Sequence, residues 1–417
     1  MADADPVTLI ADMGARARTA AAALARVPTE RKRAGLRAAA AAIRAEEAVI
    51  LTANAEDVAR GATRLTPALL DRLRLDRARL AGVADAVEAV AALDDPVGQV
   101  IDSRTLANGL VLSRVRVPIG VIGIIYESRP NVTADAAALC LMSGDAAILR
   151  GGSEALASNR ALHAALAYGL AAAGLPTDAV QLVPTADRAA VGAMLGGEGV
   201  LDLVIPRGGK GLVARVQAEA RVPVLAHLDG LNHVYVHASA DPTMAEAVVI
   251  DAKMRRTGIC GAMETLLIDR DYPAAAALVE KLAATGCELR GDEAARSLAQ
   301  MKAAAPEDWR TEYLDAIASV AIVDGLDGAL AHIDRHGSHH TDAIVAEDAA
   351  AAERFLAEVD SAIVLWNAST QFADGGEFGL GAEIGIATGR LHARGPVALE
   401  GLTTYKWVGR GSGQIRG

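Results

Sequence analysis

The fold is decided by a pattern first met at Val121-Ile-Gly-Ile-Ile-Tyr-Glu-Ser-Arg-Pro-Asn131, where an uninterrupted apolar run is followed by a polar turn and a helix start. A short apolar run bounded by turn residues is typical of a strand buried on both faces. Downstream, similar strands alternate with helices, at 146–149, 180–183, 201–205, 222–225 and 234–236. This alternation predicts an α/β fold with a doubly wound parallel sheet, and such sheets bind ligands at the carboxyl ends of their strands.

The chain is long enough for more than one hydrophobic core, since it has 417 residues of which 52% are hydrophobic. Residues 1–240 are expected to hold a helical N-terminal region followed by the doubly wound sheet. A second α/β domain is expected at 241–365, after a helix start at Asp241-Pro242. Residues 366–417 are rich in glycine and cannot form a core alone, so they are expected to return to the first domain and its arm.

A hairpin is expected between these helices and the sheet. Two alternating segments, 99–107 and 110–117, flank Asn108-Gly109, which is a strong signal for a two-residue turn. The hairpin of 99–117 is expected to form a β arm that pairs with another subunit in a homo-oligomer. The same pattern also fits a hairpin that stays within its own subunit.

The composition argues against several classes of function. A formal net charge of −11 disfavours a nucleic-acid partner, since such proteins carry basic patches. Three cysteines without a pairing pattern favour a reduced, cytoplasmic compartment over a disulfide scaffold. The first residues do not resemble a signal peptide, and no uncharged apolar run has the length of a membrane span, so no membrane contact is expected.

One cysteine lies in an unusual window, Lys253-Met-Arg-Arg-Thr-Gly-Ile-Cys-Gly-Ala-Met-Glu264. Cys260 stands between two glycines on the approach to an apolar strand, with two arginines upstream. Because the thiolate is the reactive form and nearby cations lower the pKa of a thiol, the window fits a nucleophilic cysteine. A small buried thiol fits it equally well. Cys140 and Cys287 lie in apolar helix and strand patterns and are expected in the core.

Two of the predicted strands end in basic glycine turns, Ile148-Leu-Arg-Gly-Gly-Ser-Glu154 and Ile205-Pro-Arg-Gly-Gly-Lys-Gly211. A glycine turn that leads into a helix N-terminus presents N–H groups to an anion, and the arginines add cations suited to phosphate. Neither turn has the spacing of a dinucleotide fingerprint or a P-loop. Together they favour one extended phosphorylated ligand, with Ser153 as the cap of the long helix that follows. The alternative is an ordinary turn with a surface arginine.

Two further features have competing interpretations. Asn131 stands at a helix start, where asparagine is commonly a cap, and from local sequence this is favoured over a donor to an oxyanion. Four histidines, His332, His336, His339 and His340, lie close together in the sequence. They lack the spacing of a known ligand set, so no metal site is expected.

Several windows together resemble one family, the gamma-glutamyl phosphate reductases of the aldehyde dehydrogenase superfamily. The most specific are Tyr126-Glu-Ser-Arg-Pro-Asn131 and Glu377-Phe-Gly-Leu-Gly-Ala-Glu-Ile-Gly385. The shorter matches run in the family's order over most of the chain: Arg150-Gly-Gly-Ser-Glu154, Ile205-Pro-Arg-Gly-Gly209, His227-Leu-Asp-Gly230, the Cys260 window, Asn367-Ala-Ser-Thr370 and Arg394-Gly-Pro396.

The resemblance implies an aldehyde dehydrogenase-like fold with an NADP-binding domain, a catalytic domain and a β oligomerisation arm. It implies NADPH-dependent reduction of L-glutamate 5-phosphate to L-glutamate 5-semialdehyde and phosphate, the second step of proline biosynthesis from glutamate. By position, it implies Cys260 as the nucleophile that forms a thioester and Asn131 as a donor to the oxyanion. The implied cofactor contacts are Arg150, Gly151, Gly152, Ser153, Glu154, Arg207, Gly208, Gly209 and Glu377.

Hydrolytic members of the superfamily carry a glutamate base before the cysteine, and the nearest position here is His227. A missing glutamate suits a reductase, because attack of water on the thioester would waste substrate. Five cations are candidates for the substrate's phosphate or α-carboxylate, and some of them are expected to be bystanders: Arg129, Arg255, Arg256, His392 and Arg394. The chain departs from the family at Thr257, Gly261 and Gln371, where proline, asparagine and arginine are usual.

Two alternatives stay open. The chain fits another acylating aldehyde dehydrogenase that uses a coenzyme A ester or a different acyl phosphate. It also fits a non-catalytic nucleotide-binding or regulatory protein that kept the fold. A transient contact with glutamate 5-kinase, which makes the unstable acyl phosphate, is a further possible partnership.

Overall fold

The computed structural model describes residues 5–416, apart from the side chain of Ala68, and divides into two compact units. The first comprises Met1–Ala226, Leu380–Gly385 and Val397–Gly417, and the second comprises His227–Gly379 and Ile386–Pro396. The observed boundary between the units follows Ala226. It therefore lies one strand earlier in the sequence than the boundary expected at residue 240. The reason is that β7 (Asn232–Val236) pairs with strands of the second sheet.

The first unit is built on a four-stranded parallel sheet of order β5-β4-β3-β6. Its strands are β3 (Val121–Tyr126), β4 (Ala146–Gly151), β5 (Val180–Leu182) and β6 (Leu203–Arg207). Every residue of β3 and β4 is buried, as the apolar runs predicted. The strand expected at 222–225 is wrong, since only a single bridge joins Val224 to Val204.

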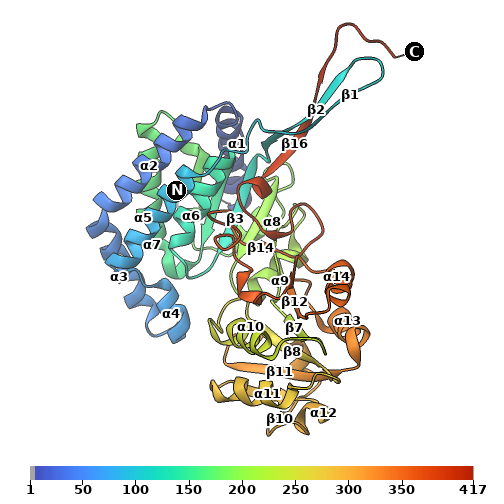
Figure 1. Cartoon of the computed structure of the whole chain (residues 1–417). Coiled ribbons are helices and arrows are strands. Elements are labelled where there is room, and N and C mark those ends of the chain that lie inside the picture. The colour runs from blue at the N-terminus through green and yellow to red at the C-terminus, as the bar shows by residue number, and fades with distance from the viewer. Residues whose placement is uncertain (1–4, 417) are drawn as a thin grey trace. The chain divides into compact units, whose positions relative to one another are not determined.

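Helices cover this sheet, and the N-terminal region is helical as predicted (Figure 1). Its helices are α1 (Pro6–Leu24), α2 (Thr29–Ala45), α3 (Glu47–Gly61), α4 (Pro67–Leu73) and α5 (Arg77–Ala92). The helices between the strands are α6 (Asn131–Ser143), α7 (Leu156–Ala172), α8 (Ala189–Leu195) and α9 (Lys210–Glu219). α2 packs against both α5 and α7, while α1 packs against α8 and β4 and contributes Ile10, Met13, Ala17 and Ala21 to the core of this sheet.

The predicted hairpin is confirmed as β1 (Val100–Thr105) and β2 (Val111–Pro118), which pair antiparallel. The two-residue turn is wrong, because the N–H of Leu106 donates to the carbonyl of Leu110 and three residues, 107–109, connect the strands. The φ of +84° at Gly109 is one that side chains disfavour. β16 (Thr403–Arg410) joins the other edge of β2, so the C-terminal segment completes a three-stranded ribbon. In Figure 1 this ribbon extends away from the helices of its own unit.

The second unit contains a seven-stranded parallel sheet of order β10-β9-β11-β8-β7-β12-β13. Its other strands are β8 (Met263–Asp269), β9 (Glu288–Gly291), β10 (Lys302–Ala303), β11 (Ile317–Val323), β12 (Thr341–Val345) and β13 (Ile363–Trp366). Its helices are α10 (Pro242–Met254), α11 (Ala275–Ala284), α12 (Glu293–Arg296), α13 (Gly325–His336) and α14 (Ala349–Glu358). The sequence of residues 292–303 predicts one longer helix, but the helix observed there, α12, ends at Arg296.

Short elements complete the chain: the antiparallel pair β14 (Ile386–Ala387) and β15 (Gly395–Pro396), and the 3-10 turns η1 (Ser153–Ala155), η2 (Thr177–Ala179), η3 (Asp308–Arg310), η4 (Thr370–Phe372) and η5 (Glu400–Leu402). Among the described residues, no helix combines the length and apolar character that a membrane crossing requires.

Candidate active site

Cys260 lies in the loop that joins α10 to β8, and its side chain is half-buried. The sequence folds this way because Asp241 caps α10, accepting the N–H of Met244 at 2.8 Å, and Pro242 occupies its first turn. The thiol packs beside three apolar residues, Ile363, Ala373 and Ile386. The cysteine is therefore neither a core thiol, as Cys140 is, nor fully exposed.

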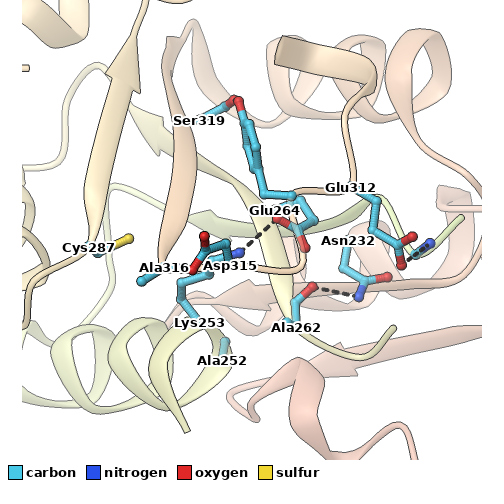
Figure 2. Close-up of polar contacts among 12 residues, drawn as sticks. Asn232, Ala252, Lys253, Ala262, Glu264, Cys287, Glu312, Asp315, Ala316 and Ser319 are labelled. Carbon is cyan, nitrogen blue, oxygen red and sulfur yellow. Dashed lines mark hydrogen bonds and ion pairs between the residues drawn. The ribbon is translucent and has the colours of Figure 1, made fainter. Parts of the chain in front are cut away.

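The backbone of Cys260 is held in place by the segment that leads into β7. Asn232 donates its Nδ2 to the carbonyl of Cys260 at 2.6 Å and to the carbonyl of Ala262 at 2.8 Å. Figure 2 shows this amide reaching the loop. Gly230 lies so close that a Cβ there would be 2.1 Å from the Cys260 carbonyl oxygen. A side chain at position 230 would collide with this carbonyl, so glycine is required there. The Cys260 loop and residues 227–230 are therefore packed tightly against each other.

A buried ion pair joins the two ends of the loop (Figure 2). Lys253 near the end of α10 donates to Glu264 in β8 at 2.7 Å, and both side chains are at most 1% exposed. Burial raises the pKa of Glu264 to about 7, and the ammonium of Lys253 opposes that rise. The Lys253 ammonium also lies 5.9 Å from the centre of the Tyr313 ring. The pair fixes where the helix stops and where the strand begins.

Two histidines share the immediate surroundings of Cys260. Single donor atoms from His227, Cys260 and His340 all lie within 4.8 Å of one another, and the two imidazole rings meet edge to face at 5.0 Å. The three residues precede β7, β8 and β12, which are neighbours in the second sheet. The group thus lies at the amino edge of these parallel strands, whereas the general rule for such sheets favoured the carboxyl edge.

The two imidazoles differ in burial and in hydrogen bonding. Nδ1 of His227 lies 2.8 Å from the carbonyl oxygen of Ile386 and can only donate to it, so the neutral ring carries its lone pair on Nε2. His340 is fully buried, with Nδ1 2.9 Å from Thr341 Oγ1 and no partner for Nε2 among the described residues. Burial, together with the nearby His227, lowers the pKa of His340 to about 3, so this ring is neutral at pH 7.

Asn131 is the first residue of α6 in the first unit and is not its cap, so the cap interpretation is wrong. The N-cap is Pro130, which makes no side-chain cap bond. Nδ2 of Asn131 instead donates to Asp135 Oδ2 at 2.8 Å. Burial raises the pKa of Asp135 to about 6, while Asn131 and the charge of Arg207 oppose the rise. One amide hydrogen of Asn131 is thus oriented by a buried carboxyl group.

The Arg150 turn differs from the expected phosphate site. Arg150 is 7% exposed, and its guanidinium donates to three backbone carbonyls, those of Gly151, Ala186 and Asp187, at 3.0–3.3 Å. The Glu154 carboxylate accepts from the backbone and the hydroxyl of Ser128 at 2.6 and 2.8 Å, and a Cβ on Gly152 would collide with that carboxylate. The side chains of Arg150 and Glu154 therefore bind groups of the chain itself and stabilise the surrounding loops.

Ser153 does not cap the long helix, so that prediction is wrong. It lies in η1, and the N-terminus of α7 is capped by Asp57 of α3. The Asp57 carboxylate accepts from the backbone and the hydroxyl of Ser158, both at 2.7 Å, and is fully buried. The helix dipole that favoured an external phosphate is therefore already matched by an internal carboxylate.

The Arg207-Gly208-Gly209 turn holds an anionic oxygen of the chain itself. The backbone N–H of Gly209 donates to Glu127 Oε2 at 3.0 Å, at the start of α9. Unlike Asp57, Glu127 is exposed, so its carboxylate can leave this position. A Cβ on Gly385 would lie 2.8 Å from Nη1 of Arg207, so Arg207 lies against this glycine. The turn is built to receive a negatively charged oxygen.

The substrate candidates divide by their neighbours. Arg255 and Arg256 are exposed just before Cys260, and Arg255 forms an ion pair at 3.5 Å with Glu377, which was expected to contact the cofactor. Arg394 donates to the carboxylate and carbonyl of Asp360 and to the carbonyl of Thr388, so its guanidinium has a structural role. The other two candidates are the exposed His392 in the second unit and the half-buried Arg129 in the first.

Gln371 and Gly261, where the chain departs from the resembling family, both have a structural explanation. Gln371 is 2% exposed, and its amide donates to the carbonyls of Ala252 and Arg256 at 3.0 and 3.2 Å, at the end of α10. A Cβ on Gly261 would lie 3.2 Å from the Thr370 carbonyl oxygen. Both residues thus contribute to the packing of the Cys260 loop.

The four C-terminal histidines do not form one cluster. His332 and His336 pack with each other and with Trp309, and Nδ1 of His339 donates to the carbonyl of Asp360. His340 turns instead toward His227 and Cys260. No local pattern in the sequence predicts that grouping, because more than a hundred residues separate His227 from His340 and only the pairing of β7 with β12 brings them together.

Comparisons with known proteins agree with this architecture. A model of the aldehyde dehydrogenase family matches residues 7–307. The chain is 72% identical over 414 residues to gamma-glutamyl phosphate reductase of Sphingopyxis alaskensis, covering 99% of this chain and 96% of that protein. It is 68% identical over 416 residues to the same enzyme of Novosphingobium aromaticivorans, covering 99% and 98%.

Solved structures give the same result. Gamma-glutamyl phosphate reductase of Thermotoga maritima has a TM-score of 0.95 at 42% identity, covering 99% of this chain and 100% of that one. An acetylating aldehyde dehydrogenase of Geobacillus thermoglucosidasius has a TM-score of 0.70 at 16% identity, covering 99% and 98%, and this second likeness concerns the fold alone.

Proposed function

The chain belongs to the aldehyde dehydrogenase family and, within it, to the gamma-glutamyl phosphate reductases, and we propose that it works with NADPH through a thioester on Cys260. Its reaction is the reduction of L-glutamate 5-phosphate to L-glutamate 5-semialdehyde, a step of proline biosynthesis. The observation that carries the mechanism is the half-buried Cys260, held by Asn232 and placed within 4.8 Å of an imidazole donor.

The first chemical step is attack of the Cys260 thiolate on the acyl phosphate carbon. His227 takes the thiol proton on Nε2, because Nδ1 donates to the Ile386 carbonyl. Phosphate leaves, and Cys260 carries the glutamyl group as a thioester. On the resemblance of its motif, Asn131 is proposed as a side-chain donor to the oxyanion. The protonated His227 is then no base for water, which protects the thioester from hydrolysis.

A bound nicotinamide cofactor supplies the hydride that reduces the acyl carbon. His227 returns its proton to the resulting oxyanion. The thiohemiacetal then collapses to the aldehyde and releases Cys260. The net reaction consumes one hydride and one proton and releases phosphate, and each group of the chain returns to its starting state.

The Gly208-Gly209 turn is proposed to bind the pyrophosphate of NADPH. The turn fits, since the Gly209 N–H already receives a carboxylate oxygen from the exposed Glu127, which cofactor binding would displace. Arg207 lies beside this turn. Arg150 with the 151–154 turn is proposed only as a support for the cofactor loop, because its donors hold backbone carbonyls.

Arg255 and Arg256 are proposed to hold the substrate's phosphate or α-carboxylate, and His392 and Arg129 are secondary candidates. The two arginines are exposed and lie close to Cys260 in the chain. The ion pair of Arg255 with Glu377 is long and exposed, so it costs little to exchange for a substrate anion.

The test is the reverse reaction, followed as NADPH formation from the semialdehyde, NADP⁺ and phosphate. Wild type is expected to depend strictly on phosphate and to show no activity when coenzyme A replaces it. Cys260→Ser is expected to lose activity, while Cys287→Ser, which changes a buried thiol just before β9, retains it. Turnover without phosphate, or turnover by the Cys260→Ser variant, would defeat the proposal.

A further inference from the structure

His227, Cys260 and His340 form a compact set of donors of the kind that proteins use for thiophilic metals. Their donor atoms lie within 4.8 Å of one another, and no other such set occurs among residues 5–416. The donors come from three segments at the same edge of neighbouring strands, and two of these segments are anchored. Asn232 holds the Cys260 carbonyl, and Gly230 packs against it.

Both imidazoles use Nδ1 in the hydrogen bonds described above. The Ile386 carbonyl accepts from Nδ1 of His227 at 2.8 Å, which selects the tautomer of the neutral ring that has its lone pair on Nε2. Metal-binding histidines are commonly oriented by such a carbonyl. His340 uses Nδ1 toward Thr341, and its buried Nε2 has no partner within residues 5–416. A buried nitrogen without a partner is costly, and a cation would satisfy it.

The chemical types of the three donor atoms indicate which metal ion the site would bind. One thiolate and two imidazoles suit Zn²⁺ and the similar Co²⁺, while a set without a carboxylate disfavours Mg²⁺ and Ca²⁺. Bound distances are about 2.0–2.1 Å to nitrogen and about 2.3 Å to sulfur, which hold the donors closer together than the 4.8 Å limit that contains all three atoms. His227 and Cys260 are only half-buried, so rotation of their side chains can achieve this. Three protein ligands leave a fourth position for water.

We infer that these three residues bind one Zn²⁺ ion and that the bound ion reversibly inhibits the enzyme. Binding replaces the thiol proton of Cys260, which is released to solvent, and forms a sulfur–metal bond that removes the nucleophile. The binding site is independent of the mechanism. The inhibition rests on the proposed function, in which Cys260 attacks the substrate.

Binding is tested with Co²⁺ as a spectroscopic probe. The full-length protein is reduced, freed of metal with a chelator and titrated without oxygen. A thiolate-to-cobalt charge-transfer band is expected to grow to one equivalent, with the d–d absorption of tetrahedral Co²⁺, and Zn²⁺ should displace it. Absence of binding at one equivalent, or purely octahedral Co²⁺, overturns the site.

Variants identify the ligands. Cys260→Ser is expected to abolish the charge-transfer band, and His340→Gln to weaken Co²⁺ binding by at least about tenfold. Since His340 is buried, His227→Gln is a second variant with the same expectation. Cys287→Ser and His336→Gln serve as matched controls of the same residue types elsewhere in the second unit, and both should bind as wild type does. A band that survives in the Cys260→Ser variant, or undiminished binding in both histidine variants, rejects the assignment.

Inhibition is measured separately in the reverse assay. Zn²⁺ should reduce turnover at one equivalent, and a chelator should restore it. If Co²⁺ binds as described but Cys260→Ser keeps full turnover, the metal site stands and the proposed mechanism fails. If the Cys260→Ser variant is inactive but wild type binds no metal, the mechanism stands and the metal site is rejected.

Discussion

The two imidazoles near Cys260 are suited to different tasks by their burial. His340 is fully buried and keeps a neutral ring, since burial lowers its pKa to about 3. His227 is half-buried, and its bond to the Ile386 carbonyl leaves Nε2 as the proton acceptor. In the proposed mechanism, proton exchange with the thiol is therefore assigned to His227. This mechanism requires no glutamate for that task.

Replacing His227 with glutamine tests this division. We expect kcat to fall by about 10²–10⁴, the usual contribution of a general base. The pH at which iodoacetamide alkylates the Cys260 thiol at half its maximal rate should also rise, because the imidazolium no longer favours the thiolate. His336→Gln is the control and should change neither quantity. An unchanged alkylation profile in the His227→Gln variant would mean that His227 only fills space.

Asp135 makes stability depend on pH. Its pKa is raised from 3.8 to about 6, so its contribution to the free energy of unfolding is fully present below about pH 4 and is lost as the pH rises through 6. The shift corresponds to about 3 kcal/mol. Asp135→Asn keeps an acceptor for Asn131 and removes the charge. Urea unfolding between pH 4 and 8 should therefore lose stability more steeply in wild type than in the Asp135→Asn variant; equal slopes would show that burial of Asp135 costs nothing.

The roles of some single residues could not be predicted from the sequence. The glycine turns at 150–154 and 207–211 were visible in the sequence, and so was the need of their N–H groups for an anion. The carboxylate of Asp57, which accepts the backbone N–H of Ser158 at the start of α7, could not be predicted from the sequence. Asp57 lies about a hundred residues upstream of Ser158, so no local pattern links them. A turn with N–H groups predicts an anion, and only the tertiary structure says whether that anion is a ligand or a side chain.

At the scale of elements, the Cys260 loop depends on the joint between α10 and β8. Lys253 and Glu264 are both buried and meet only because helix and strand are correctly placed. Removing one partner leaves a buried charge, which typically costs about 3–5 kcal/mol, whereas replacing both with apolar residues can be neutral. The pair is thus expected to specify the loop more than to stabilise the unit.

This gives a prediction for three variants. Lys253→Met should lower the free energy of unfolding by about 3–5 kcal/mol, and the double variant Lys253→Met/Glu264→Leu should recover most of it. The double variant should still show reduced kcat, because the loop loses its fixed ends. Arg354→Met, which breaks exposed ion pairs of α14, is the control and should cost less than about 1 kcal/mol. A double variant as unstable as the single one would contradict the expectation.

Elements were predictable to the extent that their signals are local. Asn108-Gly109 predicted the hairpin, and the apolar runs predicted β3, β4 and β7. The helix over 292–303 was overpredicted, because Glu293–Arg296 gives way to β10, which pairs with β9 instead. The grouping of His227 and His340 with Cys260 depends on strand order, which no local pattern encodes.

At the scale of the whole molecule, the α/β class and the two-part organisation could be predicted from the alternation of strands and helices. The position of the boundary between the two units could not be predicted from the sequence. The reason is that β7 follows the first sheet in the sequence but hydrogen-bonds to β8 and β12 of the second sheet. The glycine-rich tail was expected to return to the first domain. Leu380–Gly385 and Val397–Gly417 do so, while Ile386–Pro396 stays with the second unit.

The β1-β2-β16 ribbon carries the last prediction, that the chain forms homo-oligomers through this arm. Every residue of β1 is exposed within the chain, and β1 and β16 are the outer strands of the ribbon in the described part of the chain. Val100 and Ile101 on β1 and Tyr405 and Trp407 on β16 are exposed apolar side chains. Exposed strand edges with apolar side chains favour pairing with another chain, so we expect the arm to be covered in solution.

Charges on the arm should therefore reduce the molecular mass of the particle without unfolding the chain. Ile101→Glu combined with Trp407→Glu is expected to shift the mass measured by light scattering toward the monomer, because burial of two carboxylates in an interface is costly. Leu391→Glu is the control, since Leu391 is 85% exposed but lies outside the arm. A monomeric wild type would exclude the oligomer, and a double variant of unchanged mass would place the interface elsewhere.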